Sequence, residues 1–91
     1  MPHAHTHVNK GIVNRLARVE GQVRSVKSMV ESGRDCGDVL IQIAAARAAL
    51  DRAGRLILED HMQHCILEAV EEGRGQEALD DLKVALKQFI R

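Results

Sequence analysis

Two cysteines near the ends of one long apolar stretch constrain this chain more than any other feature. The stretch begins with D35-C36, continues through V39-L40-I41-Q42-I43-A44-A45-A46 and closes with H61-M62-Q63-H64-C65. If residues 36–65 form one continuous helix, a rise of ~1.5 Å per residue separates the two cysteines by ~43 Å. A single helix cannot bring them together, so any site that uses both needs a second copy of the chain.

His61 and Cys65 are four residues apart, which places them on one face of a helix. This is the spacing by which one helix offers two ligands to a metal ion. If the helix pairs antiparallel with a second copy, with the two-fold axis near Leu50 and Asp51, Cys36 of one chain lies beside Cys65 of the other. The sequence therefore predicts an intersubunit site of two cysteines and one histidine, formed twice per dimer.

Length and composition limit the class of protein. A chain of 91 residues is enough for one domain, and a monomer of this size buries a marginal core. The chain has no signal peptide and no apolar run long enough to cross a membrane, so we expect it in the cytoplasm. In that reducing compartment two cysteines indicate metal ligands or reactive thiols and not a disulfide.

Charge is distributed unevenly along the chain. The net charge is zero, yet residues 1–30 hold five cations and one anion, so the N-terminal third is basic. Phe89 is the only aromatic residue, which argues against modules that stack single-stranded bases on aromatic rings. The sequence also has no glycine-rich phosphate loop and no paired acid and base, so we do not expect an enzyme.

Hydrophobic periodicity predicts an all-α chain with helices over residues 9–32, 36–72 and 76–90, preceded by a histidine-containing tail of residues 1–8. Thr6 or Asn9 caps the first helix and Asp35 the second, while Gly33 and G73-R74-G75 end them. We expect residues 9–91 to form a single domain. Apolar residues spaced 4, 3, 4, 3 and 4 apart form a heptad seam on each of the first two helices: Ile12, Leu16, Val19, Val23, Val26 and Val30, then Val39, Ile43, Ala46, Leu50, Ala53 and Ile57.

These motifs together resemble one family of bacterial regulators. The segments R15-L16-A17-R18-V19-E20-G21-Q22, Cys36, V39 to R47 and H61-M62-Q63-H64-C65 are similar to the copper-sensitive operon repressors, whose relatives sense nickel or cobalt, formaldehyde and persulfides. The resemblance implies an all-helical homotetramer, a dimer of antiparallel four-helix-bundle dimers. It also implies a repressor that binds double-stranded operator DNA through a basic face and leaves it when the effector binds.

By position, Cys36, His61 and Cys65 match the ligands of the copper sensors, a soft set that suits Cu(I). Asp35 stands where those sensors often carry tyrosine, and the resemblance implies that it lies next to the ligands, as Asp81 does. Asp81 is the nearest match to their third-helix glutamate, and we expect it to accept a hydrogen bond from His61. An N-terminal histidine as fourth ligand would instead resemble the Ni(II) sensors, and the candidates for it are His3, His5 and His7.

For DNA contact the resemblance favours Arg15 and Arg52, with Arg18 and Arg55 behind them. The alternative is a solvated charged face with helical pairs such as Asp51–Arg55. A thiol-based sensor of persulfides, oxidants or formaldehyde is the competing function from another class. His61 discriminates between the two functions, because a metal site needs it and a dithiol switch does not.

Overall fold

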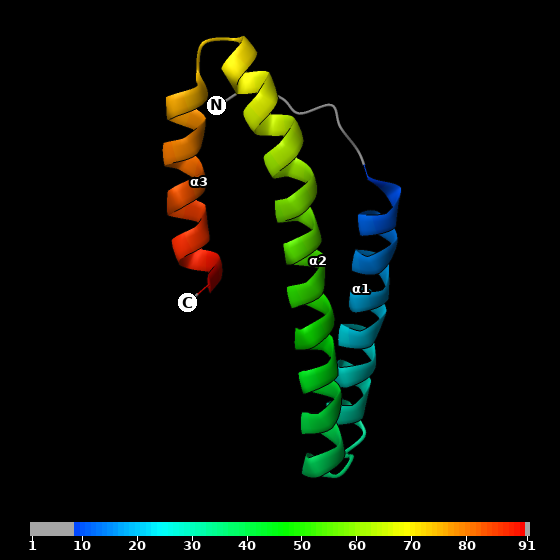
Figure 1. Ribbon diagram of the computed structural model, residues 1–91. Helices are drawn as coiled ribbons and strands as arrows, with labels where there is room; N and C mark the ends of the chain where they lie inside the picture. The colour runs from blue at the N-terminus through cyan, green and yellow to red at the C-terminus, as the bar shows by residue number, and fades with distance from the viewer. Residues whose placement is uncertain (1–8, 91) are drawn as a thin grey trace. The chain divides into compact units, whose positions relative to one another are not determined.

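A computed structural model describes residues 9–90 and shows three helices and no strand over that range. They are α1 (Lys10–Glu31), α2 (Cys36–Glu71) and α3 (Gly75–Ile90), in the order seen in Figure 1. The predicted all-α, three-helix protomer is confirmed, and each helix end lies within one residue of its predicted position. The three tail histidines, His3, His5 and His7, lie outside the described residues.

Local hydrogen bonding sets the start of α1. Asn9 has an extended backbone, with φ −102° and ψ 105°, and its side chain accepts a hydrogen bond from the backbone N–H of Ile12 at 3.2 Å. An N-cap of this kind satisfies one of the backbone donors that the first turn of a helix leaves without an intrahelical partner. Of the two N-cap candidates in the sequence, Thr6 and Asn9, Asn9 is therefore the residue that caps α1.

Glycines with positive φ end the first two helices. Gly33 has φ 72° and Gly73 has φ 75°, a conformation that side chains with a Cβ rarely adopt. After α1, the N–H of Arg34 donates to the carbonyl of Met29 at 2.9 Å and that of Gly33 to Val30 at 3.2 Å. The same pair of hydrogen bonds recurs after α2, so both turns are Schellman motifs.

The chain divides into two compact units, which share α2. One unit contains α1 and α2 up to Ile57, and the other contains α2 from Leu58 onward together with α3. In the second unit, Ala69 of α2 is buried and α3 turns Ala78, Leu82 and Leu86 to its half-buried side. Among the described helices, none has the length and apolar content that a membrane crossing requires.

In the first unit α1 and α2 form an antiparallel hairpin whose seam uses only part of each predicted stripe. Ile12 and Val19 of α1 are buried, as are Ala46 and Ala53 of α2, and each pair is seven residues apart. Of the other members, Val26, Val39 and Ile57 are half-buried. The rest are exposed: Leu16, Val23 and Val30 on α1, and Ile43 and Leu50 on α2. The heptad positions therefore divide into a seam that the hairpin fills and a set that it leaves uncovered.

Four of the uncovered residues lie together on one side of the hairpin. At about 100° per residue, Leu16 and Leu50 each lie about 50° around their helix from the buried residues, in the same rotational sense. Because the helices run antiparallel, equal rotation places both on the same side. We call the exposed set Leu16, Val23, Ile43 and Leu50 the apolar side. Val30 lies five full turns from Ile12 and therefore in the direction of the seam.

On the same two helices, exposed arginines lie on the other side of the buried residues from the apolar side. Arg15 lies about 50° from the buried residues of α1 in that direction, and Arg18 and Arg52 about 110° from those of their helices. All three side chains are exposed. We call Arg15, Arg18 and Arg52 the basic side, and the hairpin therefore separates an apolar side from a basic one.

Candidate metal centre

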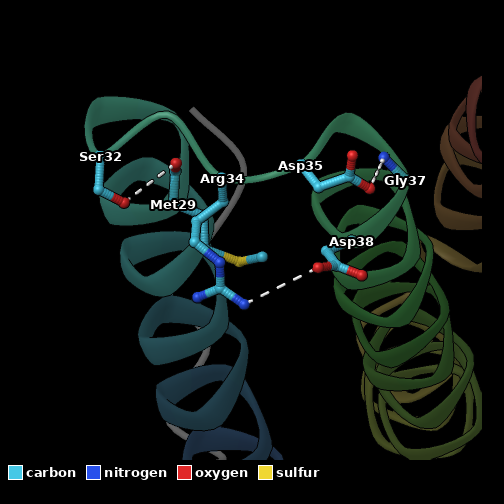
Figure 2. Close-up of polar contacts among 6 residues, drawn as sticks. All are labelled: Met29, Ser32, Arg34, Asp35, Gly37 and Asp38. Atoms are coloured by element: carbon cyan, nitrogen blue, oxygen red, sulfur yellow. Dashed lines mark hydrogen bonds and ion pairs between the residues drawn. The ribbon is translucent and has the colours of Figure 1, made fainter.

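Cys36 is the first residue of α2 and is exposed. The preceding residue, Asp35, caps the helix. Its Oδ2 accepts a hydrogen bond from the N–H of Gly37 at 3.1 Å, as Figure 2 shows, and its carbonyl accepts the first intrahelical bond, from Val39, at 3.1 Å. Asp35 thus holds the backbone on either side of Cys36.

Further polar contacts tie down the turn that leads to Cys36. The Arg34 guanidinium approaches the Asp38 carboxylate at 3.9 Å, and Ser32 Oγ donates to the carbonyl of Met29 at 3.3 Å (Figure 2). The Arg34 and Asp38 side chains are each 57% exposed, so their ion pair contributes less than ~1 kcal/mol. The turn is therefore held mainly by its backbone and capping hydrogen bonds.

His61 and Cys65 lie one helical turn apart on α2, and both are half-buried. Cys36 is the first residue of α2, whereas His61 and Cys65 lie in its last three turns, in the other compact unit. Residues 9–90 of one chain contain no group of three or more Cys, His, Asp or Glu side chains placed to hold a metal ion. One chain thus supplies Cys36 at one place and the His61–Cys65 pair at another.

Burial and two nearby carboxylates act on the Cys65 thiol in the same direction. Partial burial raises the pKa of this thiol, and the negative charges of Glu68 and Asp60 raise its pKa further. His64 is exposed on the same turn, and its Nε2 lies 3.6 Å from Asp60 Oδ1. A thiol with a raised pKa keeps its proton at neutral pH, so a metal ion that binds there must displace that proton.

Asp60 and Glu68 lie outside the predicted set of site residues. Both were visible in principle, because Asp60 lies five residues before Cys65 and Glu68 three residues after it, within a turn and a half on one helix. Asp81 lies on α3 with an exposed side chain. Its expected hydrogen bond with His61 stays a prediction.

The four arginines expected to contact DNA are all exposed. Arg15, Arg18 and Arg52 lie on the basic side of the hairpin, whereas Arg55 lies almost opposite the seam. The Arg55 guanidinium also approaches the Asp51 carboxylate at 3.3 Å, with 72% of the arginine side chain exposed. Arg55 therefore forms the helical pair that the sequence offered as the alternative to a DNA contact.

Known proteins resemble this chain over most of its length. The profile of the family described as metal-sensitive transcriptional repressor matches residues 8–88. The copper-sensing transcriptional repressor CsoR of Bacillus subtilis (strain 168) is 44% identical over 80 residues, which cover 88% of this chain and 79% of that protein. The CsoR of Mycobacterium ulcerans (strain Agy99) is 38% identical over 87 residues, covering 96% and 74%.

Solved structures agree with the sequence relatives. The crystal structure of the copper-sensing repressor CsoR with Cu(I) from Geobacillus thermodenitrificans NG80-2 superposes with a TM-score of 0.84 at 43% identity, covering 100% of this chain and 95% of that one. The nickel-responsive transcriptional regulator InrS superposes with a TM-score of 0.71 at 51% identity, covering 96% and 99%. On the match of residues 8–88 and these identities, this chain belongs to the family of metal-sensitive transcriptional repressors.

Proposed function

We propose that this protein is a copper-responsive transcriptional repressor of the cytoplasm, which acts by binding and not by catalysis. Its metal-free form binds operator DNA. Binding of Cu(I) releases the protein from the operator, which derepresses a gene for metal export or resistance. The observation that carries the proposal is the placement of Cys36 and the His61–Cys65 pair near opposite ends of one continuous helix. Two thiolates and one imidazole are a soft donor set that suits Cu(I), and the relatives named above include copper-sensing repressors.

The apolar side of the hairpin supports assembly with a second copy. Val23 is 55% exposed and Leu50 52% exposed, and soluble monomers rarely leave a contiguous set of such side chains open to water. Antiparallel pairing about Leu50 and Asp51 covers this side and brings each Cys36 to the His61–Cys65 pair of the partner subunit. Two such dimers would form the homotetramer.

The basic side of the hairpin is the proposed DNA surface. Arg15, Arg18 and Arg52 lie there, away from the side that a second copy would cover, and their guanidinium groups suit phosphate contacts. Arg55 joins them if the operator's phosphates displace its ion pair with Asp51. Metal weakens DNA binding by the same factor by which DNA weakens metal binding, since the two equilibria are linked.

A subunit-mixing experiment tests the intersubunit site. Cys36→Ala and Cys65→Ala proteins are mixed under conditions of proven subunit exchange, and Cu(I) binding is titrated anaerobically. In a mixed dimer one composite site loses both cysteines and the other keeps both, so up to one intact site per mixed dimer should return.

A matched control uses two variants of the same half-site. Mixing Cys65→Ala with His61→Ala leaves both composite sites of the mixed dimer defective, so no complete site should return. Recovery of a complete three-ligand site in this control would show that His61 and Cys65 of one site come from different chains. Absence of recovery in the first mixture would show that Cys36 and Cys65 of one site come from the same chain.

A nickel sensor is the second candidate, because the nickel-responsive regulator InrS is 51% identical to this chain. Planar Ni(II) wants a fourth donor, for which His3, His5 and His7 are the candidates. Deleting residues 1–7 separates the two functions. We expect the truncated protein to bind Cu(I) tightly and still to leave its DNA on Cu(I) addition. If truncation abolishes the response to every metal tested, the tail supplies a ligand and the nickel function replaces the copper one.

The thiol-based alternative is tested at His61. We expect His61→Ala to retain some Cu(I) on its two thiolates and yet to lose the DNA response, because the imidazole is the proposed link to Asp81 of α3. A persulfide or oxidation sensor does not need this imidazole. An unaltered release of DNA by persulfide or oxidant in His61→Ala would therefore favour the thiol-based function.

A further inference from the structure

Cys36 occupies the weakest part of its helix. The first four N–H groups of an α-helix have no intrahelical acceptor, so the first turn frays unless another group caps it. The residue after Cys36 is Gly37, which loses more conformational freedom on ordering than any other residue type. Because Cys36 is also exposed, side-chain packing within its own chain does little to hold it in place.

Asp35 supplies the missing restraint. Its carboxylate accepts a hydrogen bond from the N–H of Gly37 at 3.1 Å (Figure 2). Its carbonyl accepts one from the N–H of Val39, also at 3.1 Å, so the two bonds enclose Cys36. A Cβ built on Gly37 would lie 3.1 Å from Asp35 Oδ2, which is tighter than an ordinary contact. The absence of a side chain at Gly37 therefore leaves the space in which the carboxylate approaches the helix end.

The start of α1 repeats this arrangement without a ligand residue. Asn9 accepts from the N–H of Ile12 at 3.2 Å, and a Cβ built on Gly11 would lie 3.1 Å from Asn9 Oδ1. The residue between cap and glycine is Lys10, where α2 has Cys36. The chain thus contains two similar caps, of which only one adjoins a proposed metal ligand.

We propose that Asp35 is a positioning residue for the metal site. By capping α2 it holds the backbone of Cys36, so that the thiolate meets the imidazole and thiolate of the partner subunit in one geometry. Residues that orient a ligand without touching the metal typically change metal affinity by about 10- to 100-fold when removed. The inference rests on the proposed intersubunit site and assigns Asp35 no contact with the metal.

Three variants of the full chain test the proposal: Asp35→Ala, which removes the cap; Asp35→Asn, which keeps a capping side chain without its charge; and Asn9→Ala, which removes the similar cap on α1. Amide hydrogen exchange at Gly37 and Val39 is measured on the metal-free proteins. Cu(I) affinity is measured anaerobically by competition with bicinchoninate, and thermal unfolding follows overall stability.

Asp35→Ala should speed exchange in the first turn of α2 and weaken Cu(I) binding by about tenfold, the lower end of the usual effect of a ligand-orienting residue. Asp35→Asn should restore both to within about twofold of the original protein, because asparagine caps helices as well as aspartate does. Asn9→Ala should lower the unfolding temperature about as much as Asp35→Ala and leave Cu(I) affinity unchanged.

Three results would overturn the proposal. First, Asp35→Ala could keep its Cu(I) affinity although the amides of its first turn exchange faster. Second, Asn9→Ala could weaken Cu(I) binding as much as Asp35→Ala does, which would make the effect one of general stability. Third, Asp35→Asn could keep its exchange protection and still bind Cu(I) weakly, which would make the lost charge the cause. Failure of the unsubstituted protein to bind Cu(I) would refute the proposed function as well. The exchange data would then still show separately whether Asp35 holds the turn.

Discussion

The two cysteines occupy different surroundings on the same helix. Cys36 is exposed at the start of α2, whereas Cys65 is half-buried in its interior. Burial, followed by the charges of Glu68 and Asp60, raises the pKa of Cys65. The thiolate fraction of Cys65 is therefore lowered at neutral pH, and proton release must accompany metal binding at this residue.

In a Cys36→Ser variant, Cys65 is the only thiol, and its rate of alkylation by iodoacetamide reports its titration. We expect the midpoint of the pH–rate profile to lie above the ~8.5 of an unperturbed cysteine, because only the thiolate reacts. Glu68→Gln in the same background should lower the midpoint, since it removes a negative charge that disfavours the thiolate. A midpoint at or below ~8.5 in the metal-free protein would contradict the assigned surroundings.

At the scale of helices and turns, two glycines define where α1 and α2 end. Gly33 and Gly73 both have positive φ and both carry Schellman hydrogen bonds. Gly21, in contrast, lies inside α1, and a Cβ built there would meet nothing within 4 Å in the described chain. The same substitution should therefore have opposite effects at the turns and in the helix.

Gly33→Ala and Gly73→Ala should each lower the free energy of unfolding by ~1–2 kcal/mol, because the left-handed conformation crowds a Cβ against the backbone. Gly21→Ala is the matched control and should raise it by ~0.5–1 kcal/mol, since alanine has the higher helix propensity. Urea unfolding followed by circular dichroism measures all three. Stabilisation by Gly33→Ala would contradict the turn conformation.

At the scale of the molecule, the hairpin of α1 and the first part of α2 presents different chemistry on its two sides. The apolar side suits a second copy of the chain, and the basic side suits a polyanion. This separation allows one protomer to engage both partners at once. Each side can therefore be altered by substitution without changing the other.

Glutamate placed on the apolar side should break the assembly, because a charge buried there has no partner. Val23→Glu and Leu50→Glu should therefore shift the molar mass measured by light scattering to that of smaller species, and they should weaken Cu(I) binding along with assembly. Ser28→Glu, at an exposed position of α1 about 170° around the helix from the seam, is the matched control and should leave the mass unchanged. An intact assembly in both apolar-side variants would place the interface elsewhere.

Alanine placed on the basic side should weaken DNA binding without altering Cu(I) affinity. DNA binding is measured at several salt concentrations on a duplex from the protein's own promoter region. Arg15→Ala and Arg52→Ala should each reduce the magnitude of the slope of log K, the DNA association constant, against log salt concentration. The reduction should be ~0.9 for every phosphate that the variant no longer neutralises. Arg24→Ala removes an exposed arginine that lies on α1 outside the basic side, and it should leave the slope unchanged. Equal slopes in all variants would move the DNA surface off this side.

The amino-acid sequence by itself determined the number, type and ends of the helices. Caps such as Asn9 and Asp35 and glycines such as Gly33 act within a few residues along the chain, so their chemistry can be read without knowing what packs nearby. The same local logic placed His61 and Cys65 on one face of α2, far along it from Cys36. The ligand set itself stays a prediction, since it needs a second chain.

Only the tertiary structure decided which apolar residues are buried. The seven-residue spacing treats Val19 and Val23 alike, yet the hairpin buries Val19 and leaves Val23 exposed. Periodicity reports the direction in which a side chain points around its helix, and it does not report what lies in that direction. The raised pKa of Cys65 also depends on the tertiary structure, because desolvation requires neighbouring atoms that the linear sequence does not place.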